Sequence, residues 1–178
     1  MVDGEDLLEL ETRRRIYDHI RQSPGLHLRQ LQRELDMPLG TLEYHLHQME
    51  RASLVVTRQD GRFKAFYPHD ELDRRDRDIL YYLRQPMPRR LAMEIVGEPG
   101  VSFQELSQRV PVGLSTLSFH LKKLKAAGLI QEVREGVRKT YMCTDADRVR
   151  ALVVRYQATF LDDVVDRFAE AWLGLSPR

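Results

Sequence analysis

The sequence predicts a mainly α-helical protein that contains one small unit twice, with a short β-hairpin at the end of each copy. Shifting the 178-residue chain by 75 positions aligns residues 24–68 with residues 99–143 without a gap. Hydrophobic residues recur at helical spacing through most of each copy, whereas its last part is rich in β-forming residues around a glycine. Twelve positions are identical between the copies: Pro24, Gly25, Leu31, Leu39, Thr41, Leu42, His45, Leu46, Ala52, Leu54, Gly61, Lys64 and their counterparts. This self-similarity indicates a duplicated domain.

Three helices are expected in each copy. A Pro-Gly pair ends the first, which we predict at about 12–22 and again at about 89–96. In the first copy a short second helix follows, with Leu28, Leu31 and Leu35 on one face. A break of four residues then leads to a third helix, for which Thr41 or Ser115 can supply the N-terminal cap. The third helix places apolar residues at i, i+4 and i+7: Leu42, Leu46 and Met49, then Leu117, Leu121 and Leu124.

Two β-rich runs after each third helix are predicted to form a hairpin. The turns fall at Asp60-Gly61 and at Glu135-Gly136, and such pairs favour tight hairpin turns. Helix, helix, turn, helix, hairpin is the order of a winged helix-turn-helix domain. The expected fold class is therefore mainly α with small β-hairpin wings, a tandem winged helix-turn-helix followed by a C-terminal helix.

The segments outside the two copies are also expected to be helical. Alternating charges precede Ile79, Leu80 and Leu83, and Pro86 and Pro88 are expected to separate this linker from the second copy. The predicted divisions are 1–69, first domain; 70–87, charged helical linker; 88–143, second domain; and 144–178, amphipathic C-terminal helix.

The C-terminal segment carries a long apolar stripe. It either covers the core of its own chain or meets the same helix of a second chain, and we favour a homodimer. The residues expected at that contact are Leu152, Tyr156, Phe160, Val164, Phe168 and Trp172.

Composition bounds the remaining possibilities. With 42% hydrophobic and 31% charged residues, and with no apolar run long enough for a membrane span, we expect a cytoplasmic protein that binds no membrane. One cysteine excludes a disulfide within the chain. The net charge is only +1, but residues 112–143 hold six cations and two acids, whereas residues 37–68 hold four cations and three acids. Positive charge is thus concentrated in the second copy.

The motif YHL at 44–46 recurs as FHL at 119–121, each followed by an apolar pair and a glycine hairpin. From about residue 7 to 143 the chain resembles ArsR/MarR-like winged helix-turn-helix regulators, especially archaeal regulators with two such domains per chain. That resemblance implies transcription regulation. The thiolate pairs and terminal His/Asp sets of metal-sensing ArsR proteins do not appear, so we expect no metal and no cofactor. Ser53 also stands where the second copy keeps Gly128, at the end of the third helix.

The third helices are the candidate readers of double-stranded DNA. Hydroxyls, amides and an aromatic near the start of such a helix can contact base edges, and lysines one turn further on can contact phosphates. A plain solvated face explains the polar residues but explains outward aromatic residues less well. The predicted contacts in the helices are Thr41, Tyr44, His47, Gln48, Arg51, Ser115, Thr116, Ser118, Phe119, Lys122 and Lys123.

Two further groups complete the predicted DNA interface. His45 and His120 sit near the buried boundary and are expected to bond to neighbouring backbone or to a phosphate. The hairpins carry cations that can neutralise phosphates, although cations also protect exposed strand edges from pairing. These hairpin residues are Arg58, Arg62, Lys64, Arg134, Arg138 and Lys139.

The sequence therefore predicts a DNA-binding transcription regulator with two winged helices per chain. No catalytic arrangement is recognisable, and an enzyme is not expected. One alternative is a protein-interaction factor that docks on the transcription machinery, with Tyr44 and Phe119 as anchors and with acidic Glu43 and Glu50 beside the first reader. A third is a small-ligand sensor with a cavity between the linker and the terminal helix.

Overall fold

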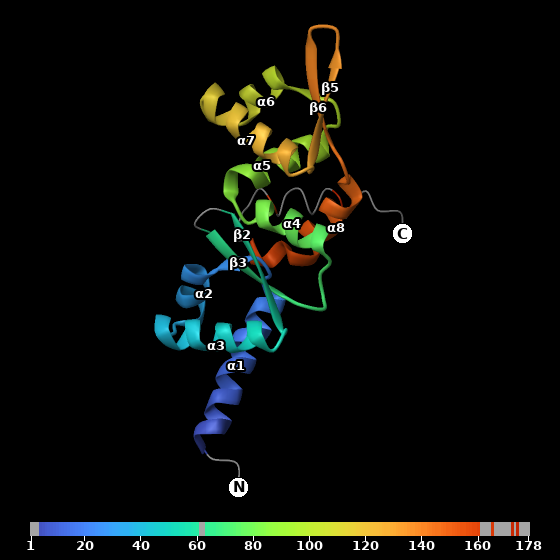
Figure 1. Ribbon diagram of the computed structural model, residues 1–178. Helices are drawn as coiled ribbons and strands as arrows, with labels where there is room; N and C mark the ends of the chain where they lie inside the picture. The colour runs from blue at the N-terminus through green and yellow to red at the C-terminus, as the bar shows by residue number, and fades with distance from the viewer. Residues whose placement is uncertain (1–3, 61–62, 161–164, 166–171, 173, 175–178) are drawn as a thin grey trace. The chain divides into compact units, whose positions relative to one another are not determined.

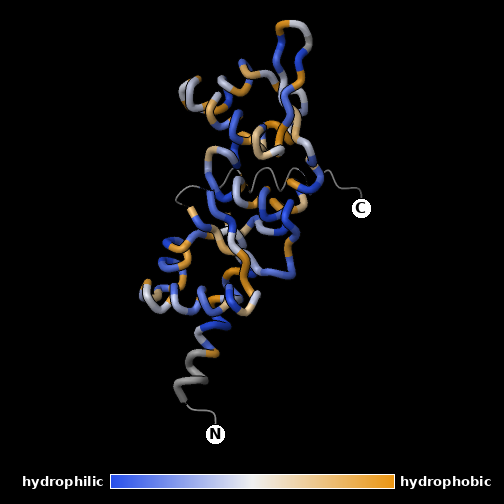
Figure 2. Tube along the Cα trace, in the orientation of Figure 1, coloured by the Kyte–Doolittle hydropathy of each residue, from blue (hydrophilic) through white to orange (hydrophobic). Residues whose placement is uncertain are grey.

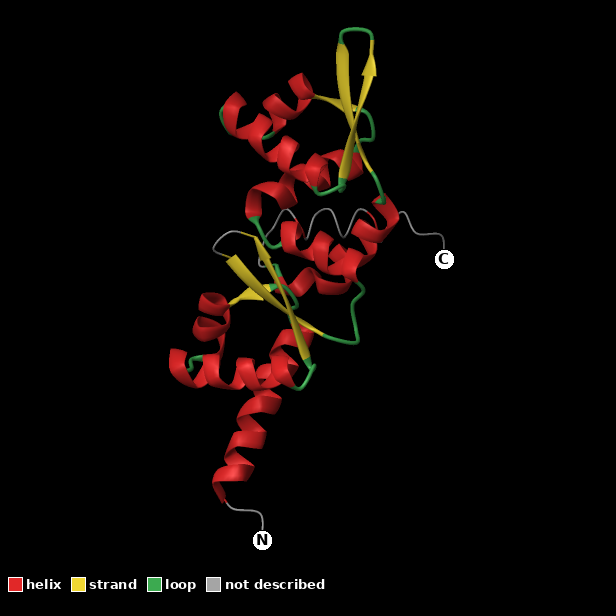
Figure 3. Cartoon of the chain, viewed as in Figure 1, coloured by secondary structure: helices red, strands yellow, loops and turns green. Residues whose placement is uncertain are grey.

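The computed structural model describes residues 4–60, 63–160, 165, 172 and 174. The chain divides into two compact units, with the boundary between Tyr81 and Tyr82. The mainly helical fold class with small hairpin sheets is confirmed, and Figure 3 shows one such hairpin in each unit.

The first unit follows the predicted order of helices and strands (Figure 1). Its first helix is longer than expected, and the second and third helices meet at the predicted turn. Its elements are α1 (Gly4–Gln22), β1 (Leu26–His27), α2 (Leu28–Leu35), α3 (Leu39–Arg51), β2 (Val55–Asp60) and β3 (Phe63–Pro68). Helix α4 (Arg74–Leu83) follows and contains the boundary between the units.

The second unit repeats the same order. Its elements are α5 (Pro86–Gly97), β4 (Val101–Ser102), α6 (Phe103–Arg109), α7 (Leu114–Ala126), β5 (Ile130–Glu135), β6 (Arg138–Cys143), α8 (Ala146–Tyr156) and the 3-10 turn η1 (Gln157–Thr159). Helix α5 begins at Pro86, because proline suits a first helical position, where its missing N–H has no partner to lose. The prolines therefore start this helix and do not separate it from the linker.

Each unit contains a three-stranded antiparallel sheet, one strand more than the predicted hairpin. The strand orders are β1-β3-β2 and β4-β6-β5. The additional strands are two residues long, and they pair Leu26 with Phe66 and Val101 with Tyr141. A run of two residues has no detectable periodicity, which is why the sequence did not predict it. The extra strand joins the hairpin to the start of the second helix in each unit.

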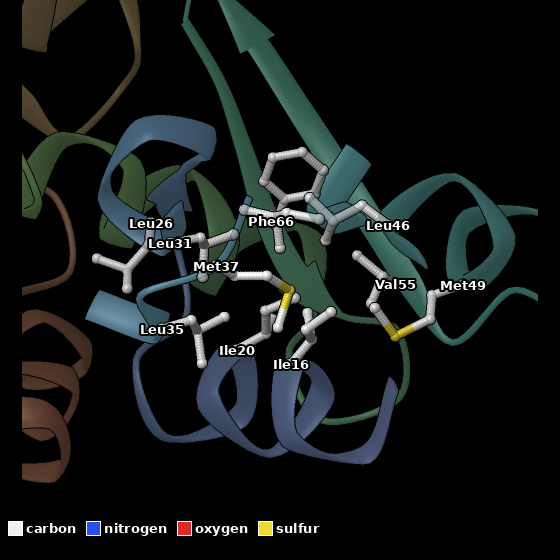
Figure 4. Packing of buried hydrophobic residues seen from close by; sticks show 11 residues of the cluster. Ile16, Ile20, Leu26, Leu31, Leu35, Met37, Leu46, Met49, Val55 and Phe66 are labelled. Carbon is white, nitrogen blue, oxygen red and sulfur yellow. The ribbon is translucent and has the colours of Figure 1, made fainter. Parts of the chain in front are cut away.

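A hydrophobic core holds the helices of the first unit against its hairpin. Figure 4 shows Ile16 and Ile20 of α1 beside Leu31 of α2, Leu46 of α3 and Phe66 of β3. These residues are almost completely buried. Hydrophobic and hydrophilic residues alternate along the helices of both units in Figure 2, as the amphipathic periodicity requires. The core thus fixes which side of α3 faces outward.

Helix α3 begins at Leu39, two residues before the predicted cap Thr41, and α7 begins at Leu114, one residue before the predicted cap Ser115. The N-cap positions are Pro38 for α3 and Gly113 for α7, and neither provides a side-chain hydrogen bond. Thr41 and Ser115 therefore lie inside the first turn, where both are exposed. The cap prediction was wrong, and it leaves these hydroxyls on the surface.

The predicted C-terminal helix is interrupted, because α8 ends at Tyr156 and the turn η1 follows, and the described residues Val165, Trp172 and Gly174 are again helical. Leu152, Tyr156 and Phe160 are buried. Phe160 packs under the guanidinium of Arg84, whose carbon lies 4.6 Å from the ring centre. The described part of the apolar stripe therefore packs within its own unit.

The rest of the predicted stripe is only partly described. The Trp172 ring centre lies 5.9 Å from the guanidinium carbon of Arg150. Val164 and Phe168, also predicted for the dimer contact, lie outside the described residues.

Both reader helices end in the same way. Ser53 (φ 55°) and Gly128 (φ 68°) are both left-handed, and the N–H groups of Leu54 and Leu129 donate to the carbonyls of Met49 and Leu124. This conformation brings the Cβ of a non-glycine residue too close to the backbone, at a cost of roughly 1 kcal/mol. The first copy keeps the helix end and accepts the strain.

Replacing Ser53 by glycine should therefore stabilise the protein by about 0.5 to 1 kcal/mol. The reverse change, Gly128→Ser, should destabilise it by about 1 kcal/mol. Urea unfolding followed by circular dichroism measures both. A Ser53→Gly variant no more stable than wild type would contradict the strain.

Candidate nucleic-acid interface

The outward face of α3 carries most of the residues predicted for it. Thr41, His47 and Arg51 are exposed, Gln48 is half-buried, and Tyr44 exposes 48% of its surface. An aromatic residue this exposed contributes nothing to the core, so burial does not explain its presence. The face is available to a partner.

The corresponding face of α7 has the same geometry and more positive charge. Phe119 exposes 59% of its surface, and Lys122 takes the place that His47 has in α3. Lys123 is half-buried. The hydroxyl residues of the first turns are exposed, and they are Ser115, Thr116 and Ser118. This face presents short polar groups and an aromatic ring first, and lysines one turn later.

Each of the two repeated histidines makes an edge-on ring contact with the aromatic residue that precedes it. His45 is only 4% exposed, and its ring meets the ring of Tyr44 edge-on at 5.1 Å between centres. His120 is half-buried and meets Phe119 in the same way at 5.2 Å. Burial lowers the pKa of His120, and the charge of Lys123 lowers it further. His45 is therefore too buried to belong to the surface set, whereas His120 is partly accessible beside Phe119.

The wing of the first unit is β2–β3, and two of its cations are held by acids of the same unit. The Lys64 ammonium lies 2.9 Å from the Glu50 carboxylate of α3. Arg58 Nε donates to Asp78 Oδ1 at 2.7 Å, and its guanidinium carbon lies 3.9 Å from the centre of the Tyr81 ring. Arg62 lies outside the described residues. The two described cations of this wing are thus engaged by acids of their own unit.

The wing of the second unit, β5–β6, carries three cations and two acids. Glu132 accepts from Lys125 at 3.0 Å and from Arg134 at 2.9 Å. The hydrogen bond from Lys125 has the largest effect on the pKa of Glu132, followed by the hydrogen bond from Arg134. Together they lower this pKa to about 2, so the carboxylate stays ionised at neutral pH. Arg138 lies 3.7 Å from Glu105. Arg134, Arg138 and Lys139 are all exposed, as predicted.

A cleft of about 760 Å³ separates this wing from α7. Its walls include Phe103 at the start of α6 and Tyr141 in β6, as well as four cations. The cations are Lys122, Lys125, Arg138 and Lys139. The sequence had indicated neither Lys125 nor the apolar wall, because only the packing of β6 against α6 brings these segments together. The sequence does contain one sign of where α6 begins: Ser102 and Glu105 have the spacing of a capping box, and they form this reciprocal cap in the structure.

Comparisons with known proteins agree with this geometry. A family described as "N-terminal HTH domain" matches residues 10–80, and one described as "Winged helix-turn-helix DNA-binding" matches residues 72–131. Together the two matches cover most of both copies, in agreement with the tandem winged helix-turn-helix fold that the repeat predicted.

Among curated proteins, the chain is 31% identical over 146 residues to an uncharacterised HTH-type transcriptional regulator of Methanocaldococcus jannaschii. The match covers 82% of this chain and 37% of that relative, so the chain spans little more than a third of the relative's length. A crystal structure described as a possible transcriptional regulator for arsenical resistance aligns with 57% of this chain and 98% of its own, at 20% identity and a TM-score of 0.37.

The described ranges contain neither a membrane-spanning helix nor a metal-binding cluster. Every helix found there is too short or too polar to cross a lipid bilayer. No three His, Cys, Asp or Glu side chains in these ranges come together in an arrangement that suits a metal ion.

Proposed function

We propose that this protein is a transcription regulator that binds double-stranded DNA through its winged helices. One observation carries the proposal: α7 presents small hydroxyls and an exposed phenyl ring outward, next to a cleft and a wing lined with cations. A helix that enters the major groove needs such groups at its start, and a wing beside it needs cations for the phosphates. The family matches and the regulator relative support the same function.

The roles of the residues divide by chemistry. We assign Ser115, Thr116 and Phe119 to contacts with base edges and thymine methyl groups. We assign Lys122 and Lys139 to phosphates, which fix the register of the helix but carry no sequence information. We expect the protein to act in the cytoplasm, where a prokaryotic chromosome lies.

Binding to a random-sequence duplex, measured by fluorescence anisotropy, tests the proposal. We expect binding at low salt that weakens steeply as salt rises, because each neutralised phosphate releases condensed counterions. A chain that fails to bind the duplex at low salt would overturn the function.

Selection from a random duplex library tests the division of roles. Replacing both Ser115 and Thr116 by alanine should change the enriched motif, because these hydroxyls face the bases. The slope of affinity against salt should stay within about 0.5 of the wild-type value, because no phosphate contact is lost. An unchanged motif would show that the two hydroxyls do not read bases.

A second function is favoured by the first unit. Its reader helix exposes Tyr44 beside acidic Glu43, and its wing cations Arg58 and Lys64 are engaged within the unit. Such a face suits a protein partner, for instance a component of the transcription machinery, better than it suits a phosphate backbone. Co-purification with that machinery that is lost in Tyr44→Ala, without loss of duplex binding, would establish this role.

Assembly into a homodimer is a separate proposal. This proposal rests on the apolar stripe of the C-terminal segment. Leu152, Tyr156 and Phe160 of this stripe are buried. Light scattering coupled to size-exclusion chromatography measures the mass directly. A monomer at the concentrations that bind DNA would exclude a dimer as the binding species.

A further inference from the structure

In each unit an ion pair joins the reader helix to the wing, but the charge that the helix supplies differs between the units. In the first unit, Glu50 on α3 holds Lys64 on β3 at 2.9 Å and accepts a hydrogen bond from Thr57 at 3.1 Å. The residue equivalent to Glu50 in the repeat is Lys125, which holds Glu132 on β5 at 3.0 Å. The helix supplies the acid in one unit and the base in the other.

The reversal leaves different charges beside the two readers. Lys139 is the counterpart of Lys64, and among the described residues no carboxylate lies within ion-pair distance of it. The same is true of Lys122. Lys139 and Lys122 both line the cleft between wing and helix. Two lysines of the second unit thus face the space where a phosphate would lie.

A second contact restrains the wing of the first unit. Arg58 is bonded to Asp78 of α4 and lies over Tyr81, and the side chains of the ion pair are 24% and 30% exposed. A bond between charged groups that is partly shielded from water, with an aromatic ring against the guanidinium, is stronger than a fully exposed pair. The second unit has Val133 at the position of Arg58 and needs no such contact.

We propose that Glu50 and Asp78 determine which winged helix holds the DNA backbone, an inference that rests on the proposed function. They engage Arg58 and Lys64 of the first wing. In the second unit Arg134 and Arg138 also lie near carboxylates, at 2.9 and 3.7 Å, but Lys122 and Lys139 have no carboxylate within ion-pair distance among the described residues, so these two lysines hold the phosphates. A cation whose charge is balanced by a carboxylate about 3 Å away attracts a phosphate weakly, because the field of the pair falls off quickly. Moving Arg58 to a phosphate would also require breaking its contact with Asp78. The first unit is therefore left to contact bases or a protein.

The test is to remove the two acids from the full chain. In the variant Glu50→Gln/Asp78→Asn, both cations become available to phosphates while the side-chain shapes are kept. Affinity for a random-sequence duplex should rise about 10-fold at moderate salt, and the salt dependence should steepen by roughly 0.9 for each new phosphate contact. Anisotropy titrations at several salt concentrations measure both quantities.

A matched variant separates this effect from a general change of charge. Asp18→Asn/Glu34→Gln also removes two acids from ion pairs of the first unit, but away from the wing. It should raise affinity less than about 3-fold and leave the slope unchanged. Adding Lys64→Gln to the variant Glu50→Gln/Asp78→Asn removes one of the two released cations. About half of the increase in salt dependence should therefore be lost.

The outcomes are distinct. Equal affinities and slopes for the two charge variants would overturn the inference while leaving the proposed function intact. A wild-type chain that does not bind duplex DNA would overturn both. Thermal unfolding of each variant confirms that the fold is kept, and the wild-type slope provides the reference in every case.

Discussion

Replacing Lys122 and Lys123 by alanine should lower the affinity for duplex DNA about 10-fold or more at moderate salt and make the salt dependence shallower by up to about 2. Both lysines lie on α7 one turn after the hydroxyls, where a helix in the major groove meets the phosphates. The loss should be similar for every duplex sequence, because phosphates carry no base identity.

The repeat offers a matched control for this experiment. His47 and Gln48 occupy the equivalent positions on α3, and their replacement by alanine should change the affinity less than about 3-fold and leave the slope unchanged. Anisotropy titrations over a range of salt concentrations give both numbers. Equal losses in the two variants would show that the units share the phosphates equally.

Replacing Leu42 by alanine should destabilise the protein by about 3 kcal/mol. Leu42 is fully buried at the centre of the side of α3 that faces the core. Removing a buried leucine side chain leaves a cavity, which costs about 2.7 to 5 kcal/mol where the surroundings cannot close it.

Urea unfolding followed by circular dichroism measures this loss. The neighbouring variant Thr41→Ala should change the stability by less than about 0.5 kcal/mol, because Thr41 is exposed. A loss below about 1 kcal/mol for Leu42→Ala would mean that α3 is held by other contacts than its apolar stripe.

Much of the fold was predictable because it depends on local periodicity. The repeat at 75 residues predicted the duplication, and the spacing of the apolar residues in α3 and α7 predicted that Tyr44 and Phe119 would be exposed. The hairpins also follow the reader helices as predicted, but the second one turns at Gly136-Val137, one residue later than the predicted Glu135-Gly136 pair. These features need only a few neighbouring residues, so the chain reveals them without its tertiary contacts.

The remaining features depend on contacts between distant residues. The partners Lys64 and Glu50 are 14 residues apart, and Arg58 and Asp78 are 20 residues apart. Residue spacing gives no sign of either pair. The sequence therefore predicts DNA contacts for Arg58 and Lys64 in the same way as for Arg51 and Arg62. The burial of His45 beneath Tyr44 was likewise set by how α3 packs.

By itself the sequence determined that this protein consists of two similar winged helices, each with one apolar and one outward face on its reader. Only the tertiary structure decided which cations remain available on those faces. The physical reason is range: helical and strand periodicity arises between residues a few positions apart, whereas the charge that a phosphate meets depends on every carboxylate that folding brings within a few ångströms.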